Sequence, residues 1–152
     1  MTEIKFRPAS LDDLPVLYDF EQGIVTAERP FDPTLKPGHI NYYDLKELIL
    51  ADDAEVIVAT ANDDIIGSGY AKIKRGESFQ SHELYAYLGF MYVKPEHRGK
   101  GVVSDLIEVL KSWANSRNLT EIRLEVYEDN HPAVRAYEKV GFKKYMVEVR
   151  IP

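Results

Sequence analysis

Apolar residues recur with two different periods along the first half of the chain. Alternation of apolar and polar residues predicts strands, whereas apolar residues three and four positions apart predict helices. On this basis we expect strands over residues 3–7, 55–61, 65–74 and 83–93, and helices over residues 11–22 and about 41–50. The expected order of this half is βααβββ, and its last three strands form an antiparallel meander.

Short local signals support the ends and turns of these elements. Ser10 precedes Asp13 by three residues, which is a variant of the capping box that begins a helix. Residues 62–64 predict a tight hairpin turn, and Gly89 within the last strand indicates a bulge or the close approach of another group. Residues 23–39 contain three prolines and two glycines, so we expect a long loop there, and such loops are often functional.

The second half of the chain, after Pro95, is expected to alternate between helices and strands. We predict a helix over residues 100–117, a strand over 122–126, a helix over 130–141 and a closing strand over 142–151. The full order is βααβββαβαβ, which describes an α/β chain with a mixed central sheet. No internal repeat is evident in the sequence, so one domain is expected to span residues 1–152.

Composition narrows the range of functions. The 152 residues include no cysteine, which excludes disulfides, cysteine-ligated metals and thiol nucleophiles. The net charge of −6 disfavours a nucleic-acid partner. Neither a signal peptide nor an apolar stretch long enough to cross a membrane is recognisable, so we expect a cytoplasmic protein with no membrane partner. The four histidines lie in separate segments, so no metal site is expected.

A glycine-containing segment over residues 95–104 lies where a predicted strand ends and a long predicted helix begins. Unpaired N–H groups at the start of a helix attract anions, and Gly99 and Gly101 allow the backbone to close around a phosphate. Residues 94–100 carry three basic side chains and one acidic side chain, on an otherwise acidic protein. An ordinary turn with solvated basic residues is the alternative. The Walker motif is absent, and Ser104 replaces the third glycine of the dinucleotide motif, which disfavours a dinucleotide site.

A second cluster lies on the last predicted helix. Asn130, Ala133, Tyr137 and Val140 are spaced so that they share one helical face. Asn130 has the chemistry of an N-cap, and Tyr137 that of a core aromatic residue. Considered alone, the helix therefore leaves a purely structural explanation of both residues open.

Together, the two clusters resemble the motifs of the GCN5-related N-acetyltransferase (GNAT) family. The acetyl-coenzyme A loop of that family reads (Q/R)xxGx(G/A), and it is matched by Arg98, Gly101 and, with a larger side chain than is typical, Val103. The later helix of the family reads NxxAxxxYxxxGF, and it is matched by Asn130, Ala133, Tyr137, Gly141 and Phe142. The resemblance implies a GNAT-like acyl-CoA N-acyltransferase fold over nearly the whole chain.

The resemblance also implies acetyl-coenzyme A as co-substrate, held between the strand that ends at Val93 and the strand that follows Thr120. Backbone groups at Met91 and Val93 correspond to those that hold the pantetheine arm in the family. The pyrophosphate is expected on the backbone N–H groups of Arg98, Gly99, Lys100, Gly101, Val102, Val103 and Ser104. The expected cofactor-binding residues of the later helix are Asn130, Ala133 and Tyr137.

The same resemblance assigns the general acid to Tyr137. Acetyl transfer to an amine needs a neutral amine, a polarised thioester carbonyl and a proton for the departing thiolate. The reference pKa of a tyrosine, near 10, is close enough to that of a thiol, about 8.5, for the phenol to donate this proton. A backbone N–H near Met91 is the expected donor to the carbonyl oxygen.

The general base is expected to be Glu125. A Leu-Glu-Val strand twelve residues before Tyr137 is similar to that of ribosomal-protein Nα-acetyltransferases, in which the glutamate is the base. The alternative is that Glu125 simply points outward from a half-solvated strand. The base of histone-type members corresponds in position to Tyr87, which disfavours that subgroup. Further candidates that the sequence does not rank are Glu21, His82 and Glu83.

The expected function is therefore transfer of the acetyl group of acetyl-coenzyme A to a primary amine of a small molecule or a peptide N-terminus, by direct attack in a ternary complex. The acceptor pocket is expected in residues 23–43, which carry Arg29, Asp32, Tyr42 and Tyr43. The alternatives are a non-catalytic acetyl-coenzyme A-binding sensor or interaction module of the same fold, and a nucleotide-binding oxidoreductase. The identity of the acceptor and the oligomeric state stay open, with a homodimer among the alternatives.

Overall fold

A five-stranded mixed sheet forms the centre of the computed structural model, which describes residues 2–152. Strand order follows the sequence, and neighbouring strands are antiparallel except β4 and β5, which run parallel. The strands are β1 (Ile4–Pro8), β2 (Ala54–Ala61), β3 (Asp64–Arg75), β4 (Leu84–Val93) and β5 (Ile122–Arg123). The helices are α1 (Leu14–Glu28), α2 (Leu45–Leu50), α3 (Val102–Ser116) and α4 (His131–Lys139), with short 3₁₀ turns at Leu11–Asp13 and Pro95–His97. The predicted α/β class and mixed sheet are confirmed.

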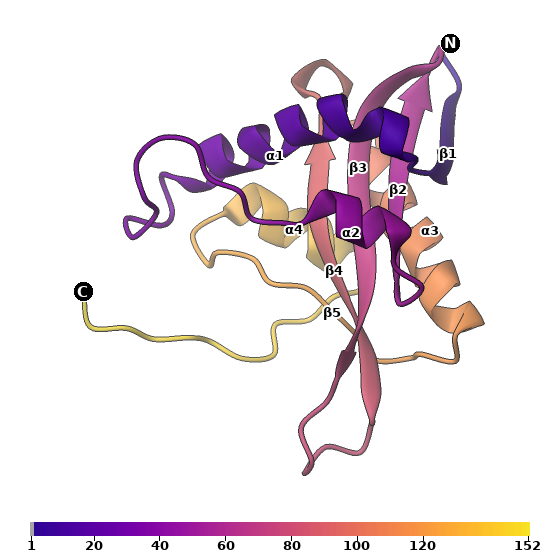
Figure 1. The fold of residues 1–152 in the computed structure, drawn as a ribbon. Helices are drawn as coiled ribbons and strands as arrows, with labels where there is room; N and C mark the ends of the chain where they lie inside the picture. The colour runs from indigo at the N-terminus through magenta and orange to yellow at the C-terminus, as the bar shows by residue number, and fades with distance from the viewer. Residues whose placement is uncertain (1) are drawn as a thin grey trace.

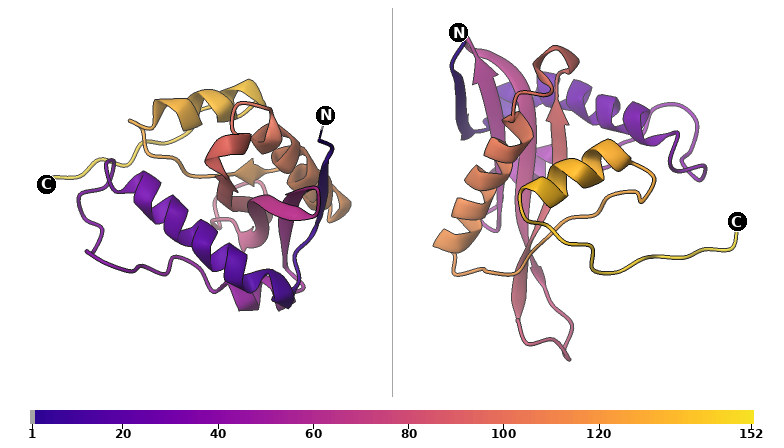
Figure 2. Two further views of the ribbon diagram at one scale, coloured as in Figure 1. Left: turned by 90° about the horizontal axis from the view of Figure 1, so that it is seen from above. Right: turned by 180° about the vertical axis from the view of Figure 1, so that it is seen from behind.

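Helices cover both faces of the sheet. Figure 1 shows α1 and α2 in front of the strands, and the view from behind in Figure 2 shows α3 and α4 on the opposite face. The strands contribute to both cores because successive side chains alternate between faces. Val56 and Val58 of β2 pack with α1 and α2, in what we call the α1 core, whereas Ile57 and Ala59 pack with α3, in the α3 core.

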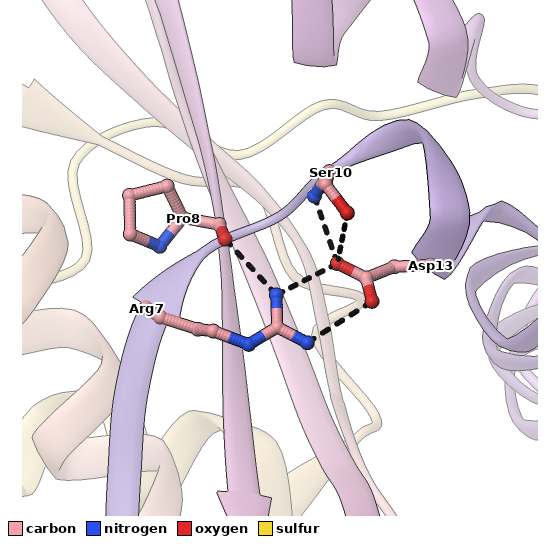
Figure 3. A network of polar contacts seen from close by, with 4 residues as sticks. All are labelled: Arg7, Pro8, Ser10 and Asp13. Atoms are coloured by element: carbon pink, nitrogen blue, oxygen red, sulfur yellow. Dashed lines mark hydrogen bonds and ion pairs between the residues drawn. The ribbon is translucent and has the colours of Figure 1, made fainter.

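A small polar network ties the end of β1 to the beginning of α1 (Figure 3). The backbone N–H of Ser10 donates to Oδ2 of Asp13 at 2.8 Å, which confirms the predicted capping box. The guanidinium of Arg7 donates to both carboxylate oxygens of Asp13, at 2.8 and 3.0 Å. These hydrogen bonds lower the pKa of Asp13, so its carboxylate stays charged and keeps the network intact at neutral pH.

Local polar residues set the turn between β2 and β3 and the start of α2. Asn62 and Asp63 have positive φ angles of 50° and 68°, as a two-residue hairpin turn requires, which confirms the predicted hairpin. Helix α2 begins at Leu45, a few residues later than predicted. The side chain of Asp44 accepts the backbone N–H of Glu47 at 3.1 Å and so caps the helix.

Strand β4 contains the bulge that Gly89 predicts. The register with β3 shifts between Ser68 and Tyr70, so that β4 has one residue more than β3 over this stretch. Phe90, within the bulge, has a φ of 59°, and the hydroxyl of Ser68 donates to the carbonyl of Phe90 at 3.0 Å. As a result, Phe90 packs in the α1 core, whereas Leu88, two residues earlier, packs in the α3 core.

Helix α1 is longer than the sequence predicts, since it continues past Gln22 to Glu28. Gly23, which was expected to begin a loop, lies inside this helix and faces β4. A Cβ atom at Gly23 would lie 2.6 Å from Cε1 of Tyr92, so glycine is needed here for the close approach of helix and strand. The same approach brings the rings of Phe20 and Tyr92 to a centroid separation of 4.7 Å, a packing contact that stabilises the helical turn around the glycine.

The predicted closing strand over residues 142–151 is wrong, because residues 143–152 form no helix or strand and are exposed. Strand β5 is also shorter than predicted, since only Ile122 and Arg123 pair with β4. A strand requires partners for its backbone N–H and C=O groups, and neither segment finds them within residues 2–152. Figure 2 shows the C-terminal segment leaving the body of the molecule. The observed order is βααβββαβα.

Candidate active site

The sheet opens between β4 and β5. Only Ala86 and Tyr87 of β4 pair with β5, and beyond them the two segments diverge, as Figure 1 shows. Among residues 2–152, the edge of β4 from Leu88 to Val93 and the chain over residues 124–127 therefore have no strand partner on the sides that face each other. Backbone groups at such unpaired edges are available to an extended ligand.

The loop before α3 has the backbone geometry of an anion site. Gly99 and Gly101 have φ angles of 76° and 82°, which glycine adopts without strain. Within residues 2–152, no backbone N–H from Gly99 to Ser104 donates to a backbone or side-chain acceptor. These consecutive donors lie at the positive end of the α3 dipole, so the loop fits a pyrophosphate such as that of coenzyme A.

Arg98 makes contacts that the sequence does not predict. Its backbone N–H donates to the carbonyl of Pro95 at 3.2 Å, so it is not one of the free donors of the loop. Its side-chain Nε donates to the carbonyl of Val93 at 2.8 Å, and its guanidinium lies 5.5 Å from the centroid of the Tyr92 ring. Arg98 thus ties the loop to the end of β4, and the Val93 carbonyl already has one hydrogen bond.

The other predicted cofactor-binding residues near the loop have side chains that pack in or against the α3 core, so only their backbone groups are available to a ligand. Val93 and Val102 are buried in the α3 core, and Met91 and Val103 pack against it. The large side chain of Val103 is therefore half-buried against the core, and its N–H remains one of the free donors.

Asn130 caps helix α4, whose first residue is His131, one position after the predicted start. The side-chain oxygen of Asn130 accepts the N–H of Ala133 at 3.4 Å, and its backbone carbonyl accepts the N–H of Val134 at 3.0 Å. The structure thus gives Asn130 the role of an N-cap. The cap fixes the start of the helix that carries Tyr137 one turn further on the same face as Ala133.

Tyr137 lies half-buried against the α3 core, and its ring packs edge-to-face on Phe142 with centroids 6.1 Å apart. Burial raises the pKa of Tyr137 to about 12, with a smaller contribution from the charge of Glu28. The hydroxyl donates to no side chain or backbone group within residues 2–152. Its proton is therefore retained at neutral pH and is available to a ligand.

Glu125 lies where the sheet opens. The hydroxyl of Tyr87 on β4 donates to Oε1 of Glu125 at 2.9 Å, so this bond bridges the two segments just as their pairing ends. Tyr87, which occupies the position of the base in histone-type members, and Glu125, the expected base of this chain, are therefore adjacent in space. The carboxylate of Glu125 is exposed and can accept a proton from a solvated ammonium group.

The loop between α1 and α2 is fastened to the segment that carries Glu125. The hydroxyl of Tyr127 donates to Oδ2 of Asp32 at 2.5 Å, and the rings of Phe31 and Tyr127 stack with centroids 6.4 Å apart. Within the loop, the guanidinium of Arg29 donates to two backbone carbonyls. The loop that is expected to bind the acceptor is thus held next to the candidate base.

Glu28 is a residue of this site that the sequence analysis missed. Burial raises the pKa of Glu28. The pKa values of Tyr42 and Tyr137 are both raised to about 12, first by the burial of the tyrosines and second by the charge of Glu28. The charge of Glu28 therefore acts on both hydroxyls. It was missed because the predicted helix ended at Gln22, although the spacing of Ile24 continues the apolar face and could have extended the helix.

The further candidate bases make structural contacts. Glu21 is buried, and its Oε2 accepts the backbone N–H groups of Tyr42 and Tyr43, both at 2.8 Å, which anchors the α1–α2 loop. His82 and Glu83 lie at the end of the β3–β4 hairpin, where each contacts an arginine.

Residues 2–152 contain neither a metal-binding cluster nor a membrane-spanning helix. No group of His, Cys, Asp and Glu side chains is placed to hold a metal ion, and no helix is both long and apolar enough to span a membrane.

Comparison with known proteins relates this chain to acetyltransferases. A model described as "Acetyltransferase (GNAT) family" matches residues 21–142. An N-alpha-acetyltransferase of Saccharolobus solfataricus is 32% identical over 150 residues, which cover 95% of this chain and 83% of that protein. A streptothricin acetyltransferase of Escherichia coli is 49% identical over 57 residues, but these cover only 38% of this chain and 33% of that enzyme.

Solved structures share the fold at low sequence identity. A predicted acetyltransferase of Clostridium acetobutylicum, solved with acetyl-CoA, has a TM-score of 0.75 at 18% identity and covers 99% of this chain and 96% of its own. An aminoglycoside N-acetyltransferase solved with CoA has a TM-score of 0.76 at 18% identity and covers 100% of this chain and 95% of its own. At these identities the likeness concerns the fold.

We expect Gly101→Asp to weaken binding of acetyl-coenzyme A at least about tenfold, or about 1.4 kcal/mol, because it places a negative charge among the free N–H donors. Titration calorimetry measures the dissociation constant. Gly38→Asp is the matched control, since Gly38 also has a φ of 82° and a Cβ there also meets no atom within 4 Å, but it lies in the α1–α2 loop. Equal affinity in the two folded variants would show that the loop is an ordinary turn.

Proposed function

We propose that this chain, which belongs to the GNAT family of acetyltransferases and is an acetyl-coenzyme A-dependent N-acetyltransferase, acetylates a primary amine by direct attack in a ternary complex. Tyr137 is the general acid and Glu125 the general base. The acceptor is a small molecule or a peptide N-terminus. The non-catalytic alternative gains no support, because the Tyr137 hydroxyl donates no hydrogen bond within residues 2–152 and the Glu125 carboxylate, although it accepts one from Tyr87, is exposed.

The observation that carries this proposal is the state of the Tyr137 hydroxyl. It is half-buried on the α4 face and donates no hydrogen bond within residues 2–152, and its pKa of about 12 keeps it protonated. A structural tyrosine with a partly buried hydroxyl commonly donates to a carbonyl or a carboxylate, as Tyr127 does to Asp32 in this chain. An uncommitted phenol beside the phosphate-binding helix is suited to donate to a ligand.

The raised pKa of Tyr137 affects how it acts as an acid. Acetyl-coenzyme A supplies the thioester that is cleaved, with a leaving thiolate whose pKa in water is near 8.5. A phenol with a pKa of about 12 transfers a proton to such a thiolate only if the thiolate is destabilised as well. Burial beside the α3 core disfavours any anion at this place, so the same environment that raises the phenol pKa favours protonation of the leaving group.

The need for Glu125 depends on the acceptor amine. At pH 7 an α-amino group costs about 1 kcal/mol to deprotonate, whereas a lysine-like amine costs about 4.6 kcal/mol. The exposed carboxylate of Glu125, held by Tyr87 at the opening of the sheet, can take this proton directly or through one water. Its contribution is therefore expected to grow with the pKa of the acceptor.

The acceptor region has an acidic and aromatic lining. Asp32 accepts the hydroxyl of Tyr127, and the charge of Glu28 acts on the hydroxyl of Tyr42. These groups suit an acceptor that arrives as an ammonium ion. The relatives named N-alpha-acetyltransferase and streptothricin acetyltransferase support both an α-amine and a small-molecule acceptor.

A screen of amines tests the proposed function. Thiol release from acetyl-coenzyme A is followed with peptides of varied N-terminal residue and with polyamines, amino acids and aminoglycosides. Turnover with one class that exceeds the hydrolysis rate in its absence, with the acetylated amine found by mass spectrometry, supports the proposal. Binding of acetyl-coenzyme A without turnover for any class would favour the sensor.

We expect Tyr137→Phe to lower kcat by roughly 10- to 10⁴-fold while the dissociation constant of acetyl-coenzyme A stays within about twofold, because only a proton donor is removed. The wild-type rate should also show no falling limb from this group below about pH 11, since its pKa is about 12. Tyr85→Phe, at the far end of β4, is the control and should keep the wild-type rate. A Tyr137→Phe variant with near-wild-type kcat would exclude Tyr137 as the acid.

For Glu125→Gln, we expect a loss of kcat/KM that is larger for a high-pKa amine than for a peptide α-amine and that shrinks as pH rises, because the amine then loses its proton unaided. Initial rates between pH 6 and 10 with both amines measure this difference. Glu128→Gln, which also changes an exposed carboxylate in the same segment, should leave both rates unchanged. Equal losses for the two amines at every pH would assign the base to another group.

A further inference from the structure

Two lysines on β3 have no acidic partner, although acidic residues outnumber basic ones in this chain. Lys72 and Lys74, which we call the lysine pair, are half-buried, and neither forms an ion pair with a carboxylate among residues 2–152. By contrast, the guanidinium of Arg123 on β5 pairs with Glu121 at 3.0 Å. A half-buried ammonium without a partner gains more from a bound anion than a fully solvated one, because water screens the attraction less.

The lysine pair lies on the same face of the sheet as Tyr87. Lys72 stands opposite Ala54 on β2 and opposite Tyr87 on β4, and both of these residues pack in or against the α1 core. Lys74, two residues further along the strand, projects to the same face. Figure 1 shows that α1 and α2 cover this face only in part, and that β3 and β4 continue beyond them to the hairpin. A ligand that lies on the uncovered part can therefore reach the ammonium groups.

Tyr87 connects the lysine pair to the candidate base. The ammonium of Lys74 lies over the Tyr87 ring, 3.8 Å from its centroid, and the hydroxyl of the same ring donates to Oε1 of Glu125 at 2.9 Å. The ring attracts the cation and so holds it at a defined position. A fixed cation thus stands one aromatic side chain away from the place where the acceptor amine loses its proton.

The surroundings of Glu125 carry opposite charges on two sides. On the side of the α1–α2 loop, Asp32 accepts the hydroxyl of Tyr127, which lies two residues after Glu125. On the side of β3 stands the lysine pair. An acceptor is therefore expected to bind with its ammonium group toward the acidic loop and with an anionic group toward the lysines.

We propose that the acceptor is a peptide with acidic residues directly after its N-terminal residue, and that the lysine pair binds their carboxylates. This inference rests on the proposed function, because it places the N-terminal amine at Glu125. Alternate side chains of a strand are about 6.5 Å apart, so the lysine pair presents two cations at the repeat of an extended peptide. A free amino acid with a neutral side chain carries a single carboxylate and cannot fill both positions.

Steady-state rates with matched peptides test the proposal. The hexapeptides share their first residue and carry Glu, Gln or Lys at positions 2–4. We expect kcat/KM for the Glu peptide to exceed that for the Gln peptide at least about tenfold, mainly through KM, and that for the Lys peptide to be lowest. The preference should shrink between about 50 and about 300 mM salt. Equal kcat/KM for the three peptides, or a preference for free glutamate over the Glu peptide, would overturn the proposal.

Substitution of the lysines shows whether they cause the preference. Lys74→Gln should lower the ratio of kcat/KM for the Glu and Gln peptides at least about fivefold, while Lys74→Arg, which keeps the charge, should retain most of it. Lys111→Gln, which removes an exposed lysine from α3 on the opposite face of the sheet, should leave the ratio unchanged. A Lys74→Gln variant that keeps the ratio, or that lowers kcat equally for all peptides, would assign Lys74 to the support of Tyr87 and Glu125 and contradict the proposal.

Binding without turnover separates this inference from the proposed function. Each peptide, labelled at its C-terminus, is titrated with the full-length protein in the presence of coenzyme A, and fluorescence anisotropy gives the dissociation constant. Tighter binding of the Glu peptide without its acetylation would support the role of the lysine pair and contradict the proposed function. Acetylation of all three peptides with equal affinity would support the proposed function and contradict the role of the lysine pair.

Discussion

The extra residue in β4 is the constraint on which both cores depend. In a regular strand, Leu88 and Phe90 would face the same side of the sheet. The bulge, with Phe90 at a φ of 59° and its carbonyl held by the hydroxyl of buried Ser68, sends Phe90 into the α1 core and returns Met91 and Val93 to the α3 side. Without the extra residue, the end of β4 would present the wrong side chains to α3 and to the loop that precedes it.

The site follows from this arrangement because β4 ends where three other features meet. Its edge beyond Tyr87 has no strand partner in the described part of the chain, since β5 stops pairing after two residues. Arg98 fastens the end of β4 to the loop whose N–H groups are free, and the α3 core that receives Met91 also supports Tyr137. Backbone donors for a phosphate, unpaired strand edges and a protonated phenol are thus supported by one continuous packed core.

Local signals in the sequence predicted the parts of the fold that local interactions determine. The capping box at Ser10, the turn at Asn62 and the bulge near Gly89 each depend on residues close together in the chain, and each is confirmed. The length of α1 was mispredicted because the role of Gly23 depends on Tyr92, almost seventy residues away. The closing strand was mispredicted because alternation shows that a segment can form a strand but not that a partner is present. The loop and helix motifs pointed to the site, whereas Glu28 joins it only through the three-dimensional packing of α1.

The position of the cofactor is tested most directly by amide hydrogen exchange of the full-length protein with and without acetyl-coenzyme A, resolved to short peptides by mass spectrometry. We expect the ligand to slow exchange in residues 99–104 and along the unpaired edge of β4 from 88 to 93, while peptides at the tip of the β3–β4 hairpin do not change. Slowed exchange only outside these two segments, at a concentration of acetyl-coenzyme A that saturates the protein, would contradict the assignment of the cofactor to the opening between β4 and β5.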